Sequence, residues 1–427
     1  MGRNPTLEIA EGMSSSEFEI LLREKESQRP VELCKTVEGM PARAPLKCQR
    51  LRIGIDVSRT LSQKTGVGYY VSNLVEALAT IDQNNEYILY PYFWHCFPPD
   101  YQNASIPNQA NFRLHRDARP VDQIIRTWRS SKPDRVLGAI DVLHSPNLTT
   151  PRLKKAKLVV TIHDLSYVVY PEFHTRENLR FSKRQTAIAT KYAAKIIAVS
   201  HHTKRDLMGY YSVPEERIHV IHQASRKAYY PERNVDFIQS SLRRLGIFKN
   251  FILFVGSLEP RKNVRTLLKA YAEYLKADSD QYLLVIAGGR GWLNDDLYAL
   301  VTELGLGRHI KFLGYVQESD LRCLYSVAKV FVYPSLYEGF GLPPLEAMAC
   351  GAPVITSYTS SLPEVVGDAA ILIDAHNVEE LFHAMRTVLL DDDLRLQLRK
   401  KSLERAKLFS WERTAQETLT VYQEACR

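Results

Sequence analysis

The segment EGFGLPPLE, from Glu338 to Glu346, combines two carboxylates with glycines and prolines at the start of an expected helix. Consecutive prolines suit the first turn of a helix, where the N–H groups that they lack would have no partner. The free N–H groups of Phe340, Gly341 and Leu342 would bind an anion, and glycine lets that anion approach the backbone. Glu346 is expected in the first turn, where the helix dipole favours the ionised form that accepts hydrogen bonds from a ribose diol. Glu338 would face a sugar; an ordinary loop-to-helix corner with surface glutamates is the alternative.

A pair of cations forms the second group, in VGSLEPRKNVRTL (residues 255–267). A strand is expected to end at Gly256 and a helix to begin near Asn263, with Arg261 and Lys262 on the loop between them. Two cations beside a helix N-terminus suit a diphosphate leaving group, which gains negative charge as its bond to a sugar breaks. The alternative is solvated surface charge.

Two loops in the first half of the chain carry further candidates. The loop KTGVG (residues 64–68) places Gly66 and Gly68 between the first strand and a helix expected from about Tyr69 to Ile81, although a plain Rossmann turn would look the same. His163 follows the strand KLVVTI and would point into a cleft, with Asp164 as a candidate orienting partner. A lone histidine in such a place is more often structural.

Val316 and Glu318 follow the strand in HIKFLGYVQESD, at the place where a nucleotide base is expected. Guanine presents two adjacent donors, N1–H and the 2-amino group, which one carboxylate can accept together, whereas uracil offers one donor there. Glu318 therefore favours guanine weakly, and a solvated glutamate explains it equally well.

Short apolar strands alternate with helical patterns from residue 51 onward, which predicts parallel sheets covered on both faces. The first series of strands is LRIGIDV, EYILYPYF, DVLHS, KLVVTIH, KIIAVS and RIHVIH, and the second is FILFVGS, YLLVIAGG, HIKFLG, KVFVYPS and APVITS. The break at residues 222–237 indicates a linker. We predict an α/β protein with a mobile N-terminal extension (1–50), two doubly wound Rossmann-like domains (51–228 and 229–410) facing across a deep cleft, and a C-terminal bracing helix (411–427).

The amino-acid composition narrows the range of expected binding partners. The 427 residues hold 56 Lys and Arg against 48 Asp and Glu, a net charge of +8, which suits a phosphorylated ligand or anionic lipid. We recognise no nucleic-acid-binding motif in the sequence. No apolar run of about 18 residues and no secretory signal are present, and six scattered cysteines suit a reducing compartment, so a cytoplasmic location is expected.

The segment PVDQIIRTWRSSKPDRV (residues 120–136) raises the question of a membrane surface. Ile124, Ile125 and Trp128 would share one helical face with basic residues around them, a pattern typical of helices that lie on anionic membranes. The competing interpretation is an ordinary helix that covers the sheet.

The motif with Glu338 and Glu346 at its ends resembles the E-x7-E signature of family 4 glycosyltransferases, and the resemblance covers residues 51–427. It implies the GT-B fold, an acceptor domain before a nucleotide-sugar donor domain, and retention at the anomeric carbon. It also implies that Glu338 lies against the donor sugar, that Glu346 holds the ribose, and that Arg261 and Lys262 clamp the diphosphate. The chain departs from some members at Ser257, where they carry another arginine.

The resemblance further implies that Gly66 and Gly68 approach the donor phosphate and acceptor, and that His163 lies near the C6 hydroxyl of the donor sugar. No metal site is expected, because the acidic clusters at 294–296 and 391–393 lie at apparent helix starts, where aspartate is favoured anyway. No cofactor is expected either, since the nucleotide-sugar is a substrate.

The sequence thus predicts a retaining, metal-independent transferase that moves a hexose to a glycan or lipid-linked glycan, with GDP-mannose as the preferred donor. The longer resemblance, over HDLSYVVYPEFHT and VGSLEPRKN, is to bacterial mannosyltransferases of surface-polysaccharide assembly. UDP-glucose, UDP-galactose and GDP-rhamnose are alternative donors. A sugar-nucleotide epimerase and a non-catalytic GT-B scaffold subunit are the alternatives from other classes, and the location could include the inner face of the cytoplasmic membrane.

Overall fold

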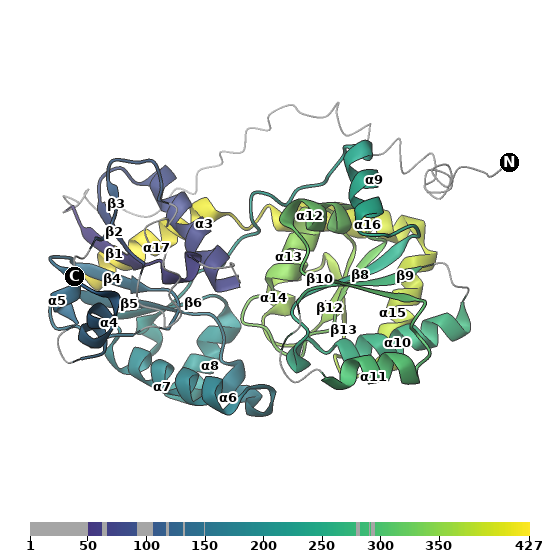
Figure 1. Cartoon of the computed structure of the whole chain (residues 1–427), viewed down its shortest axis with the longest axis horizontal. Coiled ribbons are helices and arrows are strands. Elements are labelled where there is room, and N and C mark those ends of the chain that lie inside the picture. The colour runs from purple at the N-terminus through teal and green to yellow at the C-terminus, as the bar shows by residue number, and fades with distance from the viewer. Residues whose placement is uncertain are drawn as a thin grey trace, which may run out of the picture.

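The computed structural model describes residues 50–61, 66–91, 106–116, 119–130, 133–148, 150–278, 282–289, 291 and 295–427. They form two lobes side by side, each built on one parallel sheet with helices on both faces (Figure 1). The predicted extension and the residues Lys64 and Thr65 of the glycine loop lie outside the described residues.

All strand pairs of the N-terminal sheet are parallel, in the order β3-β2-β1-β4-β5-β6-β7. The strands are nearly continuous apolar runs because both faces of the sheet are covered. Their bounds are β1 (Arg52–Asp56), β2 (Glu86–Tyr90), β3 (Phe112–Leu114), β4 (Val142–Ser145), β5 (Lys157–Ile162), β6 (Lys195–Ala198) and β7 (Ile218–Val220).

Helix α3 (Gly66–Ile81) follows β1 and buries one face, on which Tyr70, Val71, Leu74 and Leu78 recur at helical spacing. It begins at Gly66, three residues before the predicted start. The other helices of this lobe are η1 (Ser58–Thr60), α4 (Val121–Arg129), α5 (Asp134–Leu137), α6 (Ser166–Val169), η3 (Pro171–Phe173), α7 (Arg176–Tyr192), α8 (His201–Tyr211) and η4 (Glu215–Arg217).

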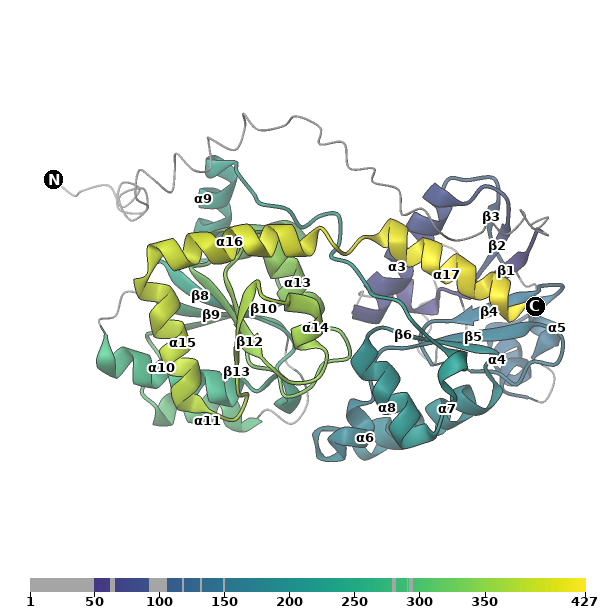
Figure 2. The same ribbon diagram turned by 180° about the vertical axis from the view of Figure 1, so that it is seen from behind.

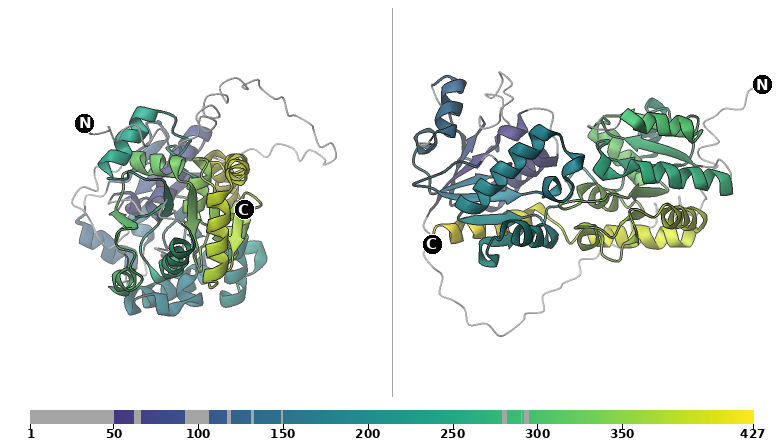
Figure 3. Two further views of the ribbon diagram at one scale, coloured as in Figure 1. Left: turned by 90° about the vertical axis from the view of Figure 1, so that its right-hand side faces the viewer. Right: turned by 90° about the horizontal axis from the view of Figure 1, so that it is seen from below.

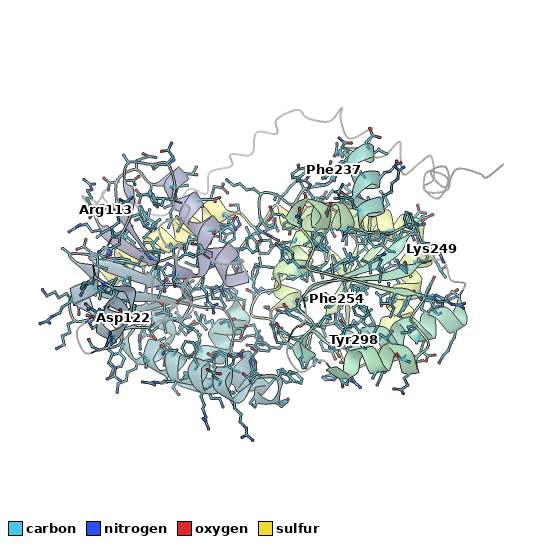
Figure 4. The ribbon with its side chains drawn as sticks, viewed as in Figure 1. Arg113, Asp122, Phe237, Lys249, Phe254 and Tyr298 are labelled. Atoms are coloured by element: carbon cyan, nitrogen blue, oxygen red, sulfur yellow. The ribbon has the colours of Figure 1, made fainter. Side chains whose placement is uncertain are left out.

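The C-terminal sheet is also parallel, in the order β10-β9-β8-β11-β12-β13. Its strands are β8 (Phe251–Val255), β9 (Leu283–Ala287), β10 (Ile310–Gly314), β11 (Val330–Tyr333), β12 (Val354–Ser357) and β13 (Ala370–Ile373). Phe254 of β8 lies in the interior of this lobe (Figure 4). The sequence analysis predicted the first five strands and missed β13.

The helices of the second half begin with α9 (Val235–Arg244), which starts within the predicted linker and extends beyond it, and end with α17 (Trp411–Ala425). Between them lie η5 (Pro260–Lys262), α10 (Val264–Ala277), α11 (Asp295–Glu303), α12 (Glu318–Val327), α13 (Leu342–Ala349), α14 (Leu362–Val366), α15 (Val378–Leu390) and α16 (Asp392–Ala406). Asp391 caps α16 by accepting from the N–H of Leu394, as expected of an aspartate at a helix start.

Strand order reverses beside the first strand of each sheet, between β1 and β4 and between β8 and β11. Open parallel sheets bind ligands at such switch points, beyond the carboxyl ends of the strands. The predicted functional residues lie there: Gly66 and Gly68 after β1, His163 after β5, Arg261 and Lys262 after β8, and Glu338 after β11.

Helix α17 returns from the C-terminal lobe to the N-terminal one (Figure 2). It packs against α3, and its buried residues Trp411, Ala415 and Tyr422 belong to the same hydrophobic core as β1 and α3. The predicted bracing helix is therefore part of the N-terminal lobe, and the chain crosses between lobes twice. Seen from below, the yellow C-terminal helices run along both lobes (Figure 3).

Helix α4 contradicts the predicted membrane-facing surface. Ile124 is 1% exposed and Trp128 is 7% exposed, because both fill the core between α4 and the sheet. The outer face of α4 is polar, with Asp122 and Arg126 exposed (Figure 4). The competing interpretation, a helix that covers the sheet, is correct for these two side chains; those of Ile125 and Arg129 lie outside the described part.

None of the helices in the described residues is both long and apolar enough to cross a bilayer.

We expect Trp411→Ala to lower the free energy of unfolding by about 3–5 kcal/mol, the usual cost of truncating a buried aromatic side chain. Trp411 is 4% exposed, its indole N–H donates to the carbonyl oxygen of Ser225 at 3.0 Å, and its ring lies edge-on to Tyr70. Denaturant unfolding measures the change. Gln416→Ala, on the exposed face of the same helix, should stay within about 0.5 kcal/mol of the parent; equal effects of the two substitutions would contradict the docking of α17.

Candidate active site

The candidate active site lies where loops from the two lobes touch. A Cβ atom on Gly339 would lie 1.6 Å from the carbonyl oxygen of His163, so only glycine permits this approach of two backbones. The hydroxyl of Thr203 donates to the carbonyl oxygen of Gly339 at 3.2 Å. The loop after β5 and the loop after β11 therefore form one surface, with His163 and Glu338 carried on adjoining segments.

Tyr337 and Phe340 strengthen this contact from the C-terminal lobe. The Tyr337 hydroxyl donates to Asp206 of α8 at 2.5 Å. Phe340 packs in a small cluster of buried apolar residues with Val199, Leu345 and Val365. Since Val199 and Asp206 belong to the N-terminal lobe, the loop after β11 is held from both sides of the site.

Glu338 is the centre of a buried polar cluster. Its Oε1 accepts from Lys262 Nζ at 2.6 Å, from the Ser335 hydroxyl at 2.7 Å and from the Tyr333 hydroxyl at 2.9 Å, and its Oε2 accepts from Arg261 Nη1 at 2.9 Å. Burial would raise the pKa of this carboxyl, but the two cations and their hydrogen bonds outweigh it and lower the pKa to about 2. Glu338 is therefore an ionised acceptor and not a proton donor.

Arg261 and Lys262 lie side by side on η5, at the end of β8. Burial and the neighbouring Arg261 lower the pKa of the Lys262 ammonium, and Glu338 partly offsets them. Arg261 also donates to the carbonyl oxygen of Tyr337 at 2.8 Å. Asn263, with a left-handed φ of 57°, ends the turn and donates to the carbonyl oxygens of Pro334 and Ala375. Arg261 Nη2 also lies 3.4 Å from Glu259, so the two cations are matched by two carboxylates, Glu338 and Glu259.

The start of α13 has the features that the sequence predicted for an anion site. Gly341, with φ 109°, is the N-cap residue, and prolines occupy the first turn. The Ser361 hydroxyl contacts the carbonyl oxygens of Glu338 and Phe340, which holds the preceding turn. Within the described part of the chain, the N–H groups of Phe340, Gly341 and Leu342 have no acceptor. Such groups suit an anionic ligand.

Glu346 differs from its prediction. It is the fifth residue of α13, past the first turn, and burial raises the pKa of its carboxyl, with Arg226 as the main opposing influence. Arg226 Nε donates to Glu346 at 3.0 Å. The ionised form of Glu346 thus depends on this arginine and not on the helix dipole, because depth in the lobe outweighs a dipole that fades within one turn.

Arg226 also joins Glu346 to Glu318. Its Nη1 donates to Glu318 at 2.6 Å, and its guanidinium lies 4.0 Å from the ring centre of Tyr69 and 4.4 Å from that of Tyr229. The structure brings the two predicted nucleotide-binding carboxylates together around one cation. The sequence analysis missed Arg226, because no motif surrounds it; its place in the break between the domains was the available signal.

His163 is positioned by Pro146 and Tyr70. The Nε2–H of its ring donates to the carbonyl oxygen of Pro146 at 2.8 Å, and the ring lies edge-on to Tyr70 at 4.9 Å. Burial lowers the pKa of His163, which favours a neutral ring with its Nδ1 as acceptor. The proposed orienting role of Asp164 is wrong: this carboxylate accepts from the N–H and hydroxyl of Ser166 and caps the following turn.

The remaining candidates lie around this centre. Gly66 is exposed, and a Cβ added to it would meet no atom within 4 Å, whereas Gly68 is buried one residue before Tyr69. Val316 is half-buried against the core of the C-terminal lobe, two residues before Glu318. Tyr333 and Ser335, at the end of β11, complete the Glu338 cluster and were not predicted.

Two facing Rossmann-type lobes with an anion-binding corner between them define the GT-B class of glycosyltransferases. Residues 64–224 match the family model described as Glycosyltransferase Family 4, and residues 242–405 match that of Glycosyl transferases group 1. O-antigen chain mannosyltransferase B of Escherichia coli is 34% identical over 367 residues, which cover 84% of this chain and 96% of that protein. The chain belongs to the family 4 glycosyltransferases.

A second relative agrees with this assignment, and two solved structures agree with the fold. O-antigen chain mannosyltransferase RfbU of Salmonella typhimurium is 28% identical over 338 residues, covering 78% of this chain and 90% of that protein. Sucrose-phosphate synthase from Thermosynechococcus elongatus superposes with a TM-score of 0.69 at 24% identity, over 88% of this chain and 99% of that one. WaaG, a glycosyltransferase of lipopolysaccharide biosynthesis, gives a TM-score of 0.64 at 16% identity, over 86% and 98% of the two chains. The predicted family and fold are confirmed.

We expect Glu338→Gln to destabilise the protein near pH 7 by about 3–5 kcal/mol, because it leaves the buried Lys262 ammonium without its carboxylate and removes one of the two carboxylates beside Arg261. The folded pKa of Glu338 lies below its ordinary value of 4.5, at about 2. Its contribution is therefore present above about pH 4.5 and is lost as the pH falls toward 2.

Denaturant unfolding at several pH values tests this expectation: the gap between parent and Glu338→Gln should be widest above pH 5 and should narrow in acid. Glu303→Gln, on the exposed end of α11, is the control and should show no such gap. A parent and a Glu338→Gln protein of equal stability near pH 7 would contradict the buried-cluster interpretation.

Proposed function

We propose that this glycosyltransferase moves a mannosyl residue from GDP-mannose to a glycan or lipid-linked glycan during assembly of a bacterial surface polysaccharide, with retention and without a metal. The observation that carries the proposal is the 34% identity that spans nearly the whole of O-antigen chain mannosyltransferase B. The charges and hydrogen-bond donors at the carboxyl ends of β8 and β11 support the chemistry.

The leaving group is a nucleoside diphosphate, which gains negative charge as the bond to the sugar breaks. Arg261 and Lys262 are fixed beside Glu338, and the N–H groups at the start of α13 lie on the same loop as Glu338. Preorganised donors and cations of this kind stabilise developing charge at a site that excludes water. Their combined charge is the reason to expect transfer without a divalent ion.

The nucleoside would lie over the C-terminal lobe, against Glu346 and Glu318. In the unliganded protein both carboxylates accept from the guanidinium of Arg226. The N1–H and 2-amino edge of guanine offers adjacent N–H donors much as a guanidinium does, so a carboxylate that accepts from Arg226 can accept from guanine. Glu346 is proposed for the ribose hydroxyls, with Val316 beside the base.

The donor sugar would lie between His163 and Glu338. His163 offers an unprotonated Nδ1, since its Nε2–H is engaged by Pro146, and this nitrogen suits a sugar hydroxyl. Gly66 and Gly68 would let the phosphate and acceptor approach α3. Association with an anionic membrane surface now rests on the net charge of +8 alone, because the apolar face of α4 is buried.

A donor panel tests the proposal: GDP-mannose, GDP-rhamnose, UDP-glucose and UDP-galactose are each incubated with the full chain, without acceptor, and released nucleoside diphosphate is measured. We expect GDP-mannose to be hydrolysed fastest, with equal rates in excess EDTA. With an acceptor supplied, NMR of the product should show the α-configuration of the donor. Preference for a UDP-sugar would overturn the donor assignment, and activity lost in EDTA and restored by Mg²⁺ or Mn²⁺ would overturn metal independence.

We expect Lys262→Met to lower turnover about 100–1,000-fold, since removal of one preorganised charge donor typically costs that much. Methionine retains the apolar stem that packs under the site. Lys269→Met, on the exposed face of α10, is the matched control and should leave turnover unchanged. Near-normal turnover by a folded Lys262→Met protein would exclude Lys262 from the stabilisation of the leaving group.

A further inference from the structure

Three potential metal ligands meet where the lobes touch, apart from the donor site. His201, His222 and Glu364 each present a ligand atom, and these atoms lie within 4.8 Å of one another. Glu364 lies on α14 of the C-terminal lobe. His201 is the first residue of α8, and His222 follows β7 at the start of the connection between lobes, so the cluster draws on both sides.

The hydrogen bonds of the cluster join His222 to Glu364 and leave the His201 ring accessible. Glu364 accepts from the main-chain N–H of His201 at 2.9 and 3.0 Å and from the His222 ring Nε2 at 2.5 Å. The His201 ring lies edge-on to that of His222 at 5.9 Å and is exposed, without a hydrogen bond in the described part of the chain. Arg405 donates to the main-chain oxygens of Glu364 and Val365, and its guanidinium lies over the Phe409 ring; among the described residues no hydrogen bond joins it to the Glu364 carboxylate.

Two imidazole nitrogens and one carboxylate are a donor set that Zn²⁺ prefers, with a fourth position left for water. Zinc takes nitrogen and oxygen ligands at about 2.0–2.2 Å, which places tetrahedral ligands about 3.3 Å apart. The present spacing thus requires shifts of about 1 Å. Rotation of the exposed His201 ring and a slight widening of the contact between His222 and Glu364 supply them, and the main-chain cap on α8 stays in place.

We propose that His201, His222 and Glu364 form a regulatory site for a divalent transition metal, Zn²⁺ above all, that ties the two lobes together. The metal replaces the proton between His222 and Glu364 with a bond to each. The centre of the His222 ring also lies 5.9 Å from that of Phe340 and 5.7 Å from that of Phe409. The proposed metal site therefore adjoins the loop before α13 and the segment that leads into α17. A bound metal would resist the lobe movements that substrate entry and product release require, and would slow transfer.

This site is separate from the chemistry of the donor: transfer itself is expected to persist in EDTA, and added metal is expected to inhibit. The inhibition does not depend on which sugar nucleotide is the donor. The competing interpretation is a hydrogen-bonded contact that binds no metal.

The test is a titration of the full, tag-free chain with Co²⁺, followed by visible absorption, and competition by Zn²⁺. His201→Gln removes one ligand and leaves the main-chain N–H that caps α8, so folding should be unaffected. We expect saturable binding at one Co²⁺ per chain, weakened at least about 100-fold in His201→Gln and in His222→Gln, because even loss of a residue that merely orients a ligand costs about 10–100-fold. His383→Gln, an exposed histidine on α15 beside Glu379, is the control and should bind as the parent does.

Thermal unfolding and donor turnover complete the test. Zn²⁺ should raise the melting temperature and lower turnover in the parent and in His383→Gln, and should do neither in His201→Gln. Binding that is absent, or equal in the parent and both ligand variants, would overturn the site. If His201→Gln abolishes binding but Zn²⁺ leaves the turnover of the parent unchanged, the proposal that the metal restricts movement of the lobes is wrong.

Discussion

The structure depends on the burial of one carboxylate, Glu338, between two cations. A lone buried charge would be strongly unfavourable, so Lys262, Arg261, Tyr333 and Ser335 must all reach it. They can do so because β8 and β11 are neighbours in the sheet, although about 75 residues separate them in the chain. Pairing of these strands therefore brings Glu338, after β11, to the two cations that follow β8. The same ion pairing holds Arg261 and Lys262 in place on the loop that precedes α10, where we propose that they meet a diphosphate.

A second constraint acts between the lobes. The backbones of Gly339 and His163 approach too closely for any side chain, and Thr203, Asp206 and Val199 hold the same loop from the N-terminal side. The loop that carries Glu338 is consequently shared by both lobes. Two crossings of the chain, at the linker and before α17, add to this coupling. The position of the reacting groups is thus a property of the pair of lobes and not of either sheet alone.

The sequence predicted what local patterns and motifs encode. Buried parallel strands are short apolar runs, so eleven of the strands in the described residues were predicted, whereas β3 and β13, each at one edge of its sheet and only partly buried, were missed. The glycines and prolines around Glu338 marked a helix start because their backbone preferences are intrinsic. Properties that depend on how deeply a residue is buried, or on partners far away in the sequence, could not be predicted. The amphipathic pattern of α4 is the same whether lipid or a sheet covers its apolar face, and the pKa of Glu346 is set by burial that no motif records.

Arg226 takes part both in the pairing of buried carboxylates and in the contact between the lobes. It lies in the segment that joins the lobes, yet its guanidinium bridges Glu346 of α13 and Glu318 of α12 and stacks on Tyr69 of α3. Burial raises the pKa of Glu346, and Arg226 is the cation that opposes this shift and favours the ionised carboxylate. Any ligand group that takes this carboxylate must share it with Arg226 or replace the arginine. Arg226 also contacts Tyr69 of α3 in the other lobe. A ligand that displaces Arg226 from the carboxylates would therefore also change its contact with the first turn of α3. Occupancy of the proposed nucleoside site is therefore expected to depend on the arrangement of the lobes, through Arg226.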